Sequence, residues 1–302
     1  MCIFVFQIQN RAMVLLDGKK TSKDIKEELK VKVDKLKNEG KKVPHLAAIL
    51  VGGDGASVTY VNAKVKACEY VGFDSTLVRL PSDISESDLM DEIEKINTND
   101  DIDGYIVQLP LPKHINELKV TQAISPAKDV DGFHPESLGK MMLDLPGFLP
   151  ATPYGIVQLL ERYNVETSGK HCVVVGRSHI VGSPMSILMA RNHKFGNCTV
   201  TLTHSRTKNL AEITKTADIL IVALGKTEFI TGDMVKEGVT VIDVGITRVE
   251  DASKKSGFRL LGDVNFEEVS KKASFITPVP GGVGPMTIAS LLMNTFKAIE
   301  MK

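Results

Sequence analysis

Tyr60 and Lys64, four residues apart in the segment TYVNAK, are a pair that could do chemistry. In a helix this spacing puts both side chains on one face. Val61, Val65 and Cys68 form the apolar stripe beside that face, which predicts that Lys64 lies at the rim of a core. Partial burial lowers the pKa of a lysine toward the range where it can act as a base. The alternative is a solvated helix face, where most lysines lie.

Gln108 is the second unusual residue, because it stands inside a run typical of a buried strand. The segment GYIVQLPLP has β-branched and aromatic residues, and Pro110 ends the hydrogen-bond ladder soon after the glutamine. A buried amide needs hydrogen-bond partners. Nearby backbone at the strand end can supply them, and so can another functional side chain. The segment alone leaves both possibilities open.

A glycine-containing turn suggests nucleotide binding in the second half of the chain. In VVVGRSHIVGSPM, Gly176 ends a predicted strand and Gly182 begins a helix. Backbone N–H groups there, with Arg177 and Ser178, can approach a pyrophosphate. The spacing is not G-x-G-x-x-G, and such a glycine pair also occurs as a simple tight turn.

The end of the following strand bears on the choice between NAD and NADP. NAD sites usually place an acidic residue there to bind the ribose 2′-hydroxyl. This chain has HSR, His204 to Arg206, with no carboxylate. A hydroxyl beside a guanidinium suits a 2′-phosphate and predicts NADP. An ordinary polar loop would look the same.

Two further segments are candidates for ligand contacts. The loop PVPGGVGPMT, 278–287, has glycines that let a ligand approach the backbone, and Pro285 is expected at the first position of a helix. An interdomain hinge is the alternative. In KDVDGF, Asp129 and Asp131 lack a third ligand at metal spacing, so no metal site is predicted, and turn and capping roles are the alternative.

The composition favours a small-molecule partner. The 302 residues include 37 basic and 37 acidic ones, so no overall field attracts nucleic acid or an anionic membrane. No apolar run approaches the roughly 20 residues that cross a bilayer. The cysteines are scattered and form no C-x-x-C, which indicates a reduced, cytoplasmic protein.

Expected strands and helices alternate along the chain around these residues. The expected strands of the first half are HLAAILVG, STLVRL and GYIVQL. One helix, capped near Thr21 and Ser22, precedes the first strand. A second helix covers 56–71 and a third is capped near Ser85, and these two separate the strands. After the proline-rich linker PGFLPATP, the expected strands are HCVVVG, CTVTLT, DILIVALG and VTVIDVG. This order predicts two α/β domains with parallel sheets, the second Rossmann-like.

The domain limits follow from the linker and from the last helix. We expect a catalytic domain over 13–150, rejoined by 277–302, and a nucleotide-binding domain over 151–276. Residues 1–12 are expected to be an N-terminal appendage before Met13. A ligand cleft is expected between the two domains.

Taken together, the motifs TYVNAK, GYIVQLPLP, KDVDGF, VVVGRSHIVGSPM and TPVPGGVGPMT closely resemble those of the bifunctional methylenetetrahydrofolate dehydrogenase/methenyltetrahydrofolate cyclohydrolase family, the FolD proteins. They occur in the family's order from about residue 13 to 300. The resemblance implies that Lys64 is the catalytic lysine, Tyr60 packs on the folate, Gln108 is the partner of the lysine and Asp131 holds the pterin. It implies further folate contacts at Val107, Leu109, Pro280, Gly281, Gly282 and Gly284, and NADP contacts at Gly176, Arg177, Ser178, Ser205 and Ile246.

The implied function is NADP-dependent oxidation of 5,10-methylenetetrahydrofolate and hydrolysis of the methenyl product to 10-formyltetrahydrofolate by a homodimer. Hydride transfer requires mainly alignment, whereas hydrolysis requires a proton to leave the attacking water. Lys64 is expected to handle that proton, either as a base whose pKa is depressed by about 3 units or as a charged group that orients water. The alternatives are a dehydrogenase without cyclohydrolase activity, an NAD-preferring enzyme, or a non-catalytic NADP(H)-sensing module.

Overall fold

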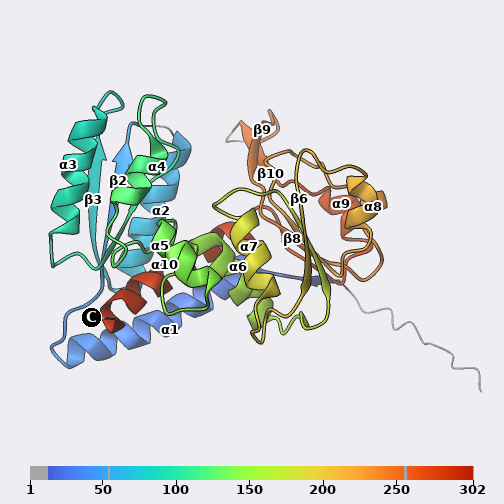
Figure 1. Ribbon diagram of the computed structural model, residues 1–302, viewed down its shortest axis with the longest axis horizontal. Helices are drawn as coiled ribbons and strands as arrows, with labels where there is room; N and C mark the ends of the chain where they lie inside the picture. Colours follow the sequence, from blue (N-terminus) through green and yellow to red (C-terminus); the bar gives the residue numbers. More distant parts are fainter. Residues whose placement is uncertain (1–12, 54, 255–256, 302) are drawn as a thin grey trace, which may run out of the picture.

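The computed structural model describes residues 13–53, 55–254 and 257–301. The expected N-terminal appendage, 1–12, lies outside the described residues. The predicted class is confirmed: the chain folds as α/β, with parallel sheets in two lobes (Figure 1).

The first lobe is built on a parallel sheet with strand order β3-β2-β4. Its strands are the apolar runs expected from the sequence, β2 (His45–Val51), β3 (Asp74–Leu80) and β4 (Gly104–Val107). Its helices are α1 (Gly18–Asn38), α2 (Gly55–Val71), α3 (Glu86–Asn97), α4 (Glu117–Ala123) and α5 (Pro135–Met142). The last residue of β4, Val107, pairs with Ile49 of β2. The chain leaves the sheet at the next residue, Gln108, whose N–H still donates to Ile49 O at 2.9 Å.

The helix starts match the sequence signals in part. Ser85 caps α3 as predicted, accepting a hydrogen bond from the N–H of Asp88. The cap of α1 was expected near Thr21 and Ser22, which is wrong: Asp17 caps it and accepts from the N–H of Lys20. Aspartate is as good an N-cap as serine, and the apolar Leu16 before it is fully buried, which fixes the earlier start.

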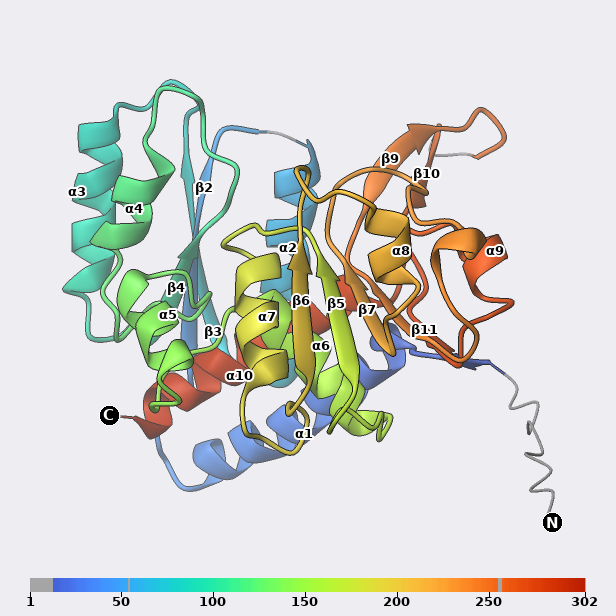
Figure 2. The ribbon, with the colours of Figure 1, turned by 45° about the vertical axis from the view of Figure 1, so that its right-hand side comes forward.

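The second lobe contains the larger parallel sheet, with strand order β1-β11-β8-β7-β5-β6. The strands are β1 (Val14–Leu15), β5 (His171–Val175), β6 (Thr199–Thr203), β7 (Ile219–Val222), β8 (Thr240–Asp243) and β11 (Phe275–Ile276). The sheet is accompanied by α6 (Ala151–Arg162), α7 (Gly182–Ala190), α8 (Leu210–Thr214), the 3₁₀ helix η1 (Gly232–Met234) and α9 (Phe266–Val269). A hairpin of β9 (Thr247–Glu250) and β10 (Phe258–Leu261) projects from this lobe (Figure 2).

The N-terminal strand differs from the expected domain limits. Residues 14–15 pair with β11 in the larger sheet, although the predicted first domain starts at residue 13. The chain thus begins in the second lobe and enters the first through α1, which runs beneath both lobes (Figure 1).

The last helix, α10 (Val283–Glu300), joins the lobes. It packs against α6, α1 and α2, and the amide of Asn294 donates to Val130 O and Leu149 O, both at 2.8 Å. Pro285 was expected at the first position of this helix, which is wrong. It is the third residue, because the helix already begins at Val283. One apolar cluster runs from Ile106 in the first sheet through α10 to Val174 in the second, so the two lobes share a core.

Candidate active site

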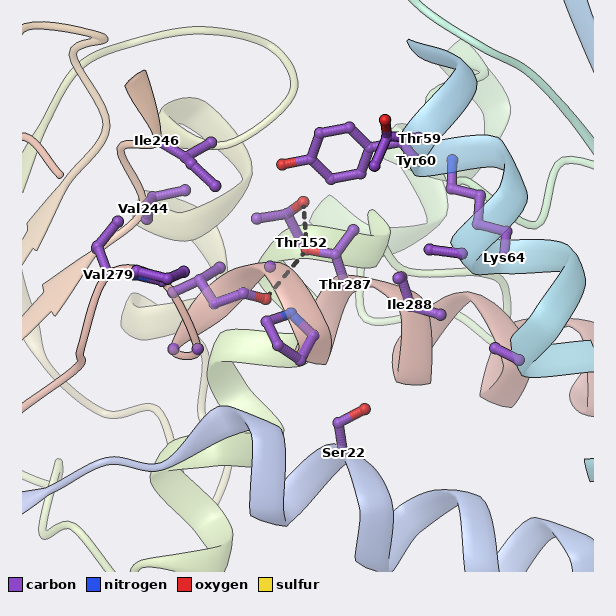
Figure 3. A pocket seen from close by; sticks show the side chains of 18 of the residues that line it. Ser22, Thr59, Tyr60, Lys64, Thr152, Val244, Ile246, Val279, Thr287 and Ile288 are labelled. Atoms are coloured by element: carbon purple, nitrogen blue, oxygen red, sulfur yellow. Dashed lines mark hydrogen bonds between the residues drawn. The ribbon is translucent and has the colours of Figure 1, made fainter. Parts of the chain in front are cut away.

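The lobes enclose a cavity of about 880 Å³. This volume lies within the roughly 300–1,000 Å³ typical of small-molecule sites. Its walls come from α1, α2, α6 and α10, from the loop after β4, from the loop after β8 and from the loop 278–282. Figure 3 shows Tyr60 on α2 and Ile246 after β8 on opposite sides of this space, with Thr152 and Thr287 between them.

Lys64 and Gln108 are hydrogen-bonded at the cavity wall. The Nζ of Lys64 donates to Oε1 of Gln108 at 3.0 Å, and the lysine is only 8% exposed. The other end of the amide, Nε2, donates to Leu109 O at 2.6 Å. The amide of Gln108 therefore binds the strand-end backbone and the side chain of Lys64 together.

The electrostatics of Lys64 follow from its burial. Loss of water around the ammonium lowers the pKa of Lys64, and the nearby carboxylate of Asp131 opposes that change. Burial likewise raises the pKa of Asp131, opposed by Lys64. Both groups are thus shifted toward their neutral forms, although each stabilises the charge of the other. A lysine in this setting exchanges protons near neutral pH more readily than a solvated one.

The two acids of KDVDGF have different places. Asp129 is buried and accepts from Ser137 Oγ at 2.7 Å, from His134 N at 2.8 Å and from Phe133 N at 3.2 Å. Burial raises its pKa to about 6. These bonds fit the turn and capping role, whereas Asp131 lines the cavity.

Tyr60 lies at the cavity mouth and is 37% exposed. Burial raises its pKa, opposed by Arg248 of the β9–β10 hairpin. The ring extends over the cavity (Figure 3), which leaves one face for a flat ligand.

The loop before α10 depends on its glycines. Gly281 has φ +108°, and a Cβ on Gly282 would lie 2.6 Å from Pro278 O. The carbonyl of Gly281 accepts from Lys19 N at 2.9 Å, which fixes the loop to the start of α1. Together with Pro280 and Gly284, these residues line the cavity.

The glycine turn of the second lobe is also tightly packed. Gly176 has φ +114°, and a Cβ on Gly182 would lie 1.9 Å from Gly176 O. Ser178 Oγ accepts from Val181 N at 3.1 Å and holds the turn. Arg177 is exposed, so its guanidinium is available to an anion at the N-terminus of α7.

Four of the five predicted cofactor contacts lie outside the lining of the cavity. Gly176, Arg177, Ser178 and Ser205 do not line it, whereas Ile246 does. Ile180 and Val181, in the same turn as Ser178, also line it, so the turn and the cavity are continuous.

Val107, an expected folate contact, does not line the large cavity. It is 6% exposed, and its side chain belongs to the apolar cluster behind β4, outside the large cavity. Because successive strand side chains point to opposite faces, a strand next to the cavity also has residues in the core.

Several cavity residues were missed by sequence reasoning. Thr152 and Thr287, whose hydroxyl oxygens are 3.0 Å apart, come from helices far apart in sequence. Asp243 ends β8, where its carboxylate accepts from Gly245, Asp263 and Val264 N–H at 2.9–3.0 Å. An acid at the end of an otherwise apolar strand was the available signal for Asp243.

These features define a class: a two-lobed α/β protein whose Rossmann-like sheet opens onto a cavity with a buried, amide-bound lysine, as expected of a nucleotide-dependent enzyme. Comparison with known proteins specifies it further. Residues 16–131 match the tetrahydrofolate dehydrogenase/cyclohydrolase catalytic domain, and residues 150–302 match the NAD(P)-binding domain of the same name. The chain belongs to the tetrahydrofolate dehydrogenase/cyclohydrolase family, the FolD proteins.

The similarity extends over nearly the whole chain. The bifunctional protein FolD of Cytophaga hutchinsonii is 72% identical over 96% of this chain and 100% of its own, and that of Flavobacterium johnsoniae is 67% identical over 96% and 98%. The FolD crystal structure from Campylobacter jejuni is 49% identical, with a TM-score of 0.90 over 96% of this chain and 99% of its own. The FolD structure from Trypanosoma brucei, complexed with NADP cofactor and inhibitor, is 37% identical, with a TM-score of 0.91 over 96% and 98%.

Proposed function

We propose that this protein is a bifunctional one-carbon folate enzyme. It oxidises 5,10-methylenetetrahydrofolate to 5,10-methenyltetrahydrofolate with NADP⁺ and hydrolyses that product to 10-formyltetrahydrofolate. The observation that carries the proposal is the Lys64–Gln108 hydrogen bond in a cavity continuous with a glycine turn, in a chain of this family. A sensing module would have no need for a desolvated lysine.

In the dehydrogenase step the residues of the cavity align the folate. Tyr60 packs on its aromatic part, Asp131 binds the pterin, and the loop 280–284 closes one side. When bound, NADP⁺ accepts the hydride from the one-carbon bridge. Arg177, Ser178 and Ser205 are the residues that would hold its phosphates, and Ile246 would contact it at the cavity wall. Positioning of this kind contributes much of the rate when little acid–base help is needed.

In the cyclohydrolase step Lys64 handles the proton of the attacking water. A neutral amine has N–H donors and one lone pair, and one N–H is already bonded to Gln108 Oε1. The lone pair then faces the water that attacks the methenyl carbon and accepts its proton. Lys64 returns that proton to N5 as the bond between the carbon and N5 breaks, and the hydroxyl proton of the adduct leaves to solvent as the formyl carbonyl forms. The burial that lowers the pKa of Lys64 favours this form over a permanently charged, purely orienting lysine.

The quaternary structure and location are part of the proposal. We place the enzyme in the cytoplasm as a homodimer, as the family resemblance implies. In the described chain β6 is an edge strand of the larger sheet and has Leu202 exposed at 37%, which suits pairing with a second copy. Light scattering on the purified protein checks the dimer. No helix in the described residues has the length and apolarity to span a membrane.

The direct test is a spectrophotometric assay of the purified protein with 5,10-methylenetetrahydrofolate and NADP⁺. We expect NADPH to form and the methenyl compound to decay faster than it does without enzyme. NADPH formation without accelerated decay would identify a dehydrogenase alone. No turnover with either cofactor would overturn the proposal.

A further inference from the structure

Two buried carboxylates lie at the edge of the larger sheet where a nucleotide would bind. Asp243 ends β8 and Asp263 follows β10, and they are 4% and 0% exposed. The carboxyl ends of parallel strands form the edge at which nucleotides bind in Rossmann-like sheets. Within the described residues, neither carboxylate forms an ion pair with a basic side chain. The hydrogen bonds that the two carboxylates accept come instead from backbone N–H groups.

Asp263 accepts from three successive N–H groups of the loop after β7, 224–226. Its Oδ2 accepts from Leu224 N at 2.6 Å and from Gly225 N at 2.9 Å. Its Oδ1 accepts from Lys226 N at 2.8 Å. Successive N–H groups that converge on one anion form a backbone nest. The carboxylate of Asp263 therefore fixes the course of this loop.

Asp243 connects Asp263 to a second loop, the one after β8. The Oδ1 of Asp243 accepts from Asp263 N at 3.0 Å and from Gly245 N at 2.9 Å. A Cβ on Gly245 would lie 2.3 Å from Cγ of Asp263, so the loop passes this acid closely only because it has a glycine there. Val244 and Ile246, on either side of that glycine, line the cavity (Figure 3).

The loop after β7 lies against the glycine turn of the second lobe. A Cβ on Gly176 would lie 2.2 Å from the carbonyl oxygen of Ala223, the residue that precedes this loop. Asp263 thus bonds to one loop that adjoins the glycine turn and, through Asp243, to another that carries Ile246. Asp263 does not itself line the cavity, so its effect on a ligand there is transmitted by these two loops.

We propose that Asp263 is a positioning residue for the cofactor, whose carboxylate holds the loops after β7 and β8 in the conformation that binds NADP⁺. The inference rests on the proposed function, because that function supplies the cofactor. Hydrolysis of the methenyl compound uses no cofactor, so its rate reports separately on the rest of the cavity. A general role in folding would affect both NADP⁺ binding and hydrolysis, whereas a positioning role affects NADP⁺ binding alone.

The test replaces Asp263 with asparagine, which exchanges one of its two acceptor oxygens for a nitrogen that can only donate. Calorimetric titration measures the Kd for NADP⁺, and initial rates measure KM for NADP⁺ and for the folate. We expect the Kd and the KM for NADP⁺ to rise at least about tenfold, because a buried N–H loses its acceptor and the loop must rearrange. We expect kcat at saturating NADP⁺, the KM for the folate and the rate of methenyl hydrolysis to change little.

The matched control is Asp218→Asn at the opposite edge of the same sheet. Asp218 directly precedes β7, and its carboxylate also accepts from a backbone N–H, that of His171, at 2.8 Å. This variant should bind NADP⁺ with the Kd of the unchanged protein. An equal rise in Kd in Asp218→Asn would attribute the effect to loosening of the whole lobe and overturn the inference. A well-folded Asp263→Asn protein with unchanged Kd would overturn it as well.

A second variant serves if Asp263→Asn does not fold. Lys226→Pro removes one N–H donor of the loop at an exposed position, and Lys226→Ala, which keeps that N–H, is its control. We expect the Kd for NADP⁺ to rise with proline and not with alanine, and equal values would overturn the inference. Loss of hydrolysis together with NADP⁺ binding in both Asp263→Asn and Lys226→Pro would show a role in folding alone and also overturn it. Because calorimetry needs no turnover, a protein that binds NADP⁺ without oxidising the folate would overturn the proposed function, while the Kd values still decide this inference.

Discussion

At the scale of single residues, Gln108 connects Lys64 to the protein. Its amide is fixed by Leu109 O on one side and accepts from Lys64 on the other. This arrangement orients the lysine and satisfies one of its donors. We therefore expect the amide to contribute more to the step that needs a proton acceptor than to the step that needs alignment.

Replacing Gln108 with leucine tests this role. The change keeps approximate size but leaves the buried Lys64 without its acceptor. We expect the cyclohydrolase rate to fall about tenfold and the dehydrogenase rate to fall less, at saturating folate. Gln122→Leu, on the exposed side of α4, is the control and should change neither rate. Equal losses in both rates would contradict a role of Gln108 that is specific to the hydrolytic step.

Asp243 provides a pH-dependent prediction. Burial raises its pKa to about 6, above the ordinary value near 3.9. The folded state thus binds its proton more tightly than the unfolded state, so this group's contribution to the free energy of unfolding increases as pH falls from about 7 to 5 and is lost as pH rises through 6.

The comparison is with Asp243→Asn, which does not titrate. The difference in free energy of unfolding between the unchanged protein and the variant should rise by roughly 1 kcal/mol in favour of the unchanged protein between pH 7 and pH 5. Urea unfolding at the two pH values measures it. A difference that does not vary with pH would show that Asp243 titrates at an ordinary value.

Only some of the site residues could be predicted from the sequence. Lys64 and Gln108 were singled out because each violates a local pattern, a lysine beside an apolar stripe and an amide in a strand. Thr152, Thr287, Lys26 and Lys66 violate no local pattern. These residues come together because α1, α2, α6 and α10 pack around the same cavity. The spacing of residues within one helix does not predict how separate helices pack.

At the scale of elements, the short apolar strands were the most predictable feature. A continuous apolar run such as DILIVALG has no polar face, so it is expected to form a strand that is buried on both faces, as β7 is. Helix starts were less predictable, because Asp17, Thr21 and Ser22 are all acceptable caps and tertiary burial of Leu16 decides among them. The proposed division at residues 150 and 277 stays a prediction, since α10 packs on helices of both lobes.

The end of β6 should determine the choice of cofactor. No carboxylate follows this strand, and Ser205 and Arg206 are exposed there. We expect kcat/KM to be higher with NADP⁺ than with NAD⁺, and Ser205→Asp to reduce that preference by charge repulsion, about tenfold. Ser82→Asp, an exposed serine of the other lobe, is the control. Equal kcat/KM values for the two cofactors in the unchanged protein would contradict this assignment.

The loop before α10 gives a second prediction at this scale. Gly282→Ala would place a Cβ 2.6 Å from Pro278 O, so the loop must shift. We expect the KM for folate to rise and the melting temperature to fall. Gly53→Ala is the matched control, since a Cβ there meets nothing within 4 Å. A Gly282→Ala protein with unchanged KM and melting temperature would exclude a structural requirement for glycine.

At the scale of the whole molecule, the proposed function requires one cavity to serve two reactions. The first lobe supplies a buried lysine and an aromatic ring, the second supplies a nucleotide-type turn, and the shared core holds them together. The sequence motifs predicted the two halves separately. Their meeting in a single cavity depends on α10, whose return between the lobes brings the glycine loop into the cavity that Lys64 and Ile246 also line.

In the proposed mechanism, Lys64 serves the hydrolytic reaction far more than hydride transfer. The decisive measurement is the separate rate of each step in Lys64→Met, which keeps the apolar stem and removes the amine, at saturating monoglutamyl folate. Lys23→Met, an exposed lysine of α1, controls for loss of a charge. We predict that methenyltetrahydrofolate hydrolysis falls by at least about 10²-fold in Lys64→Met while NADPH formation falls much less. Hydrolysis by Lys64→Met at the rate of the unchanged protein would show that Lys64 does not handle the proton of the attacking water.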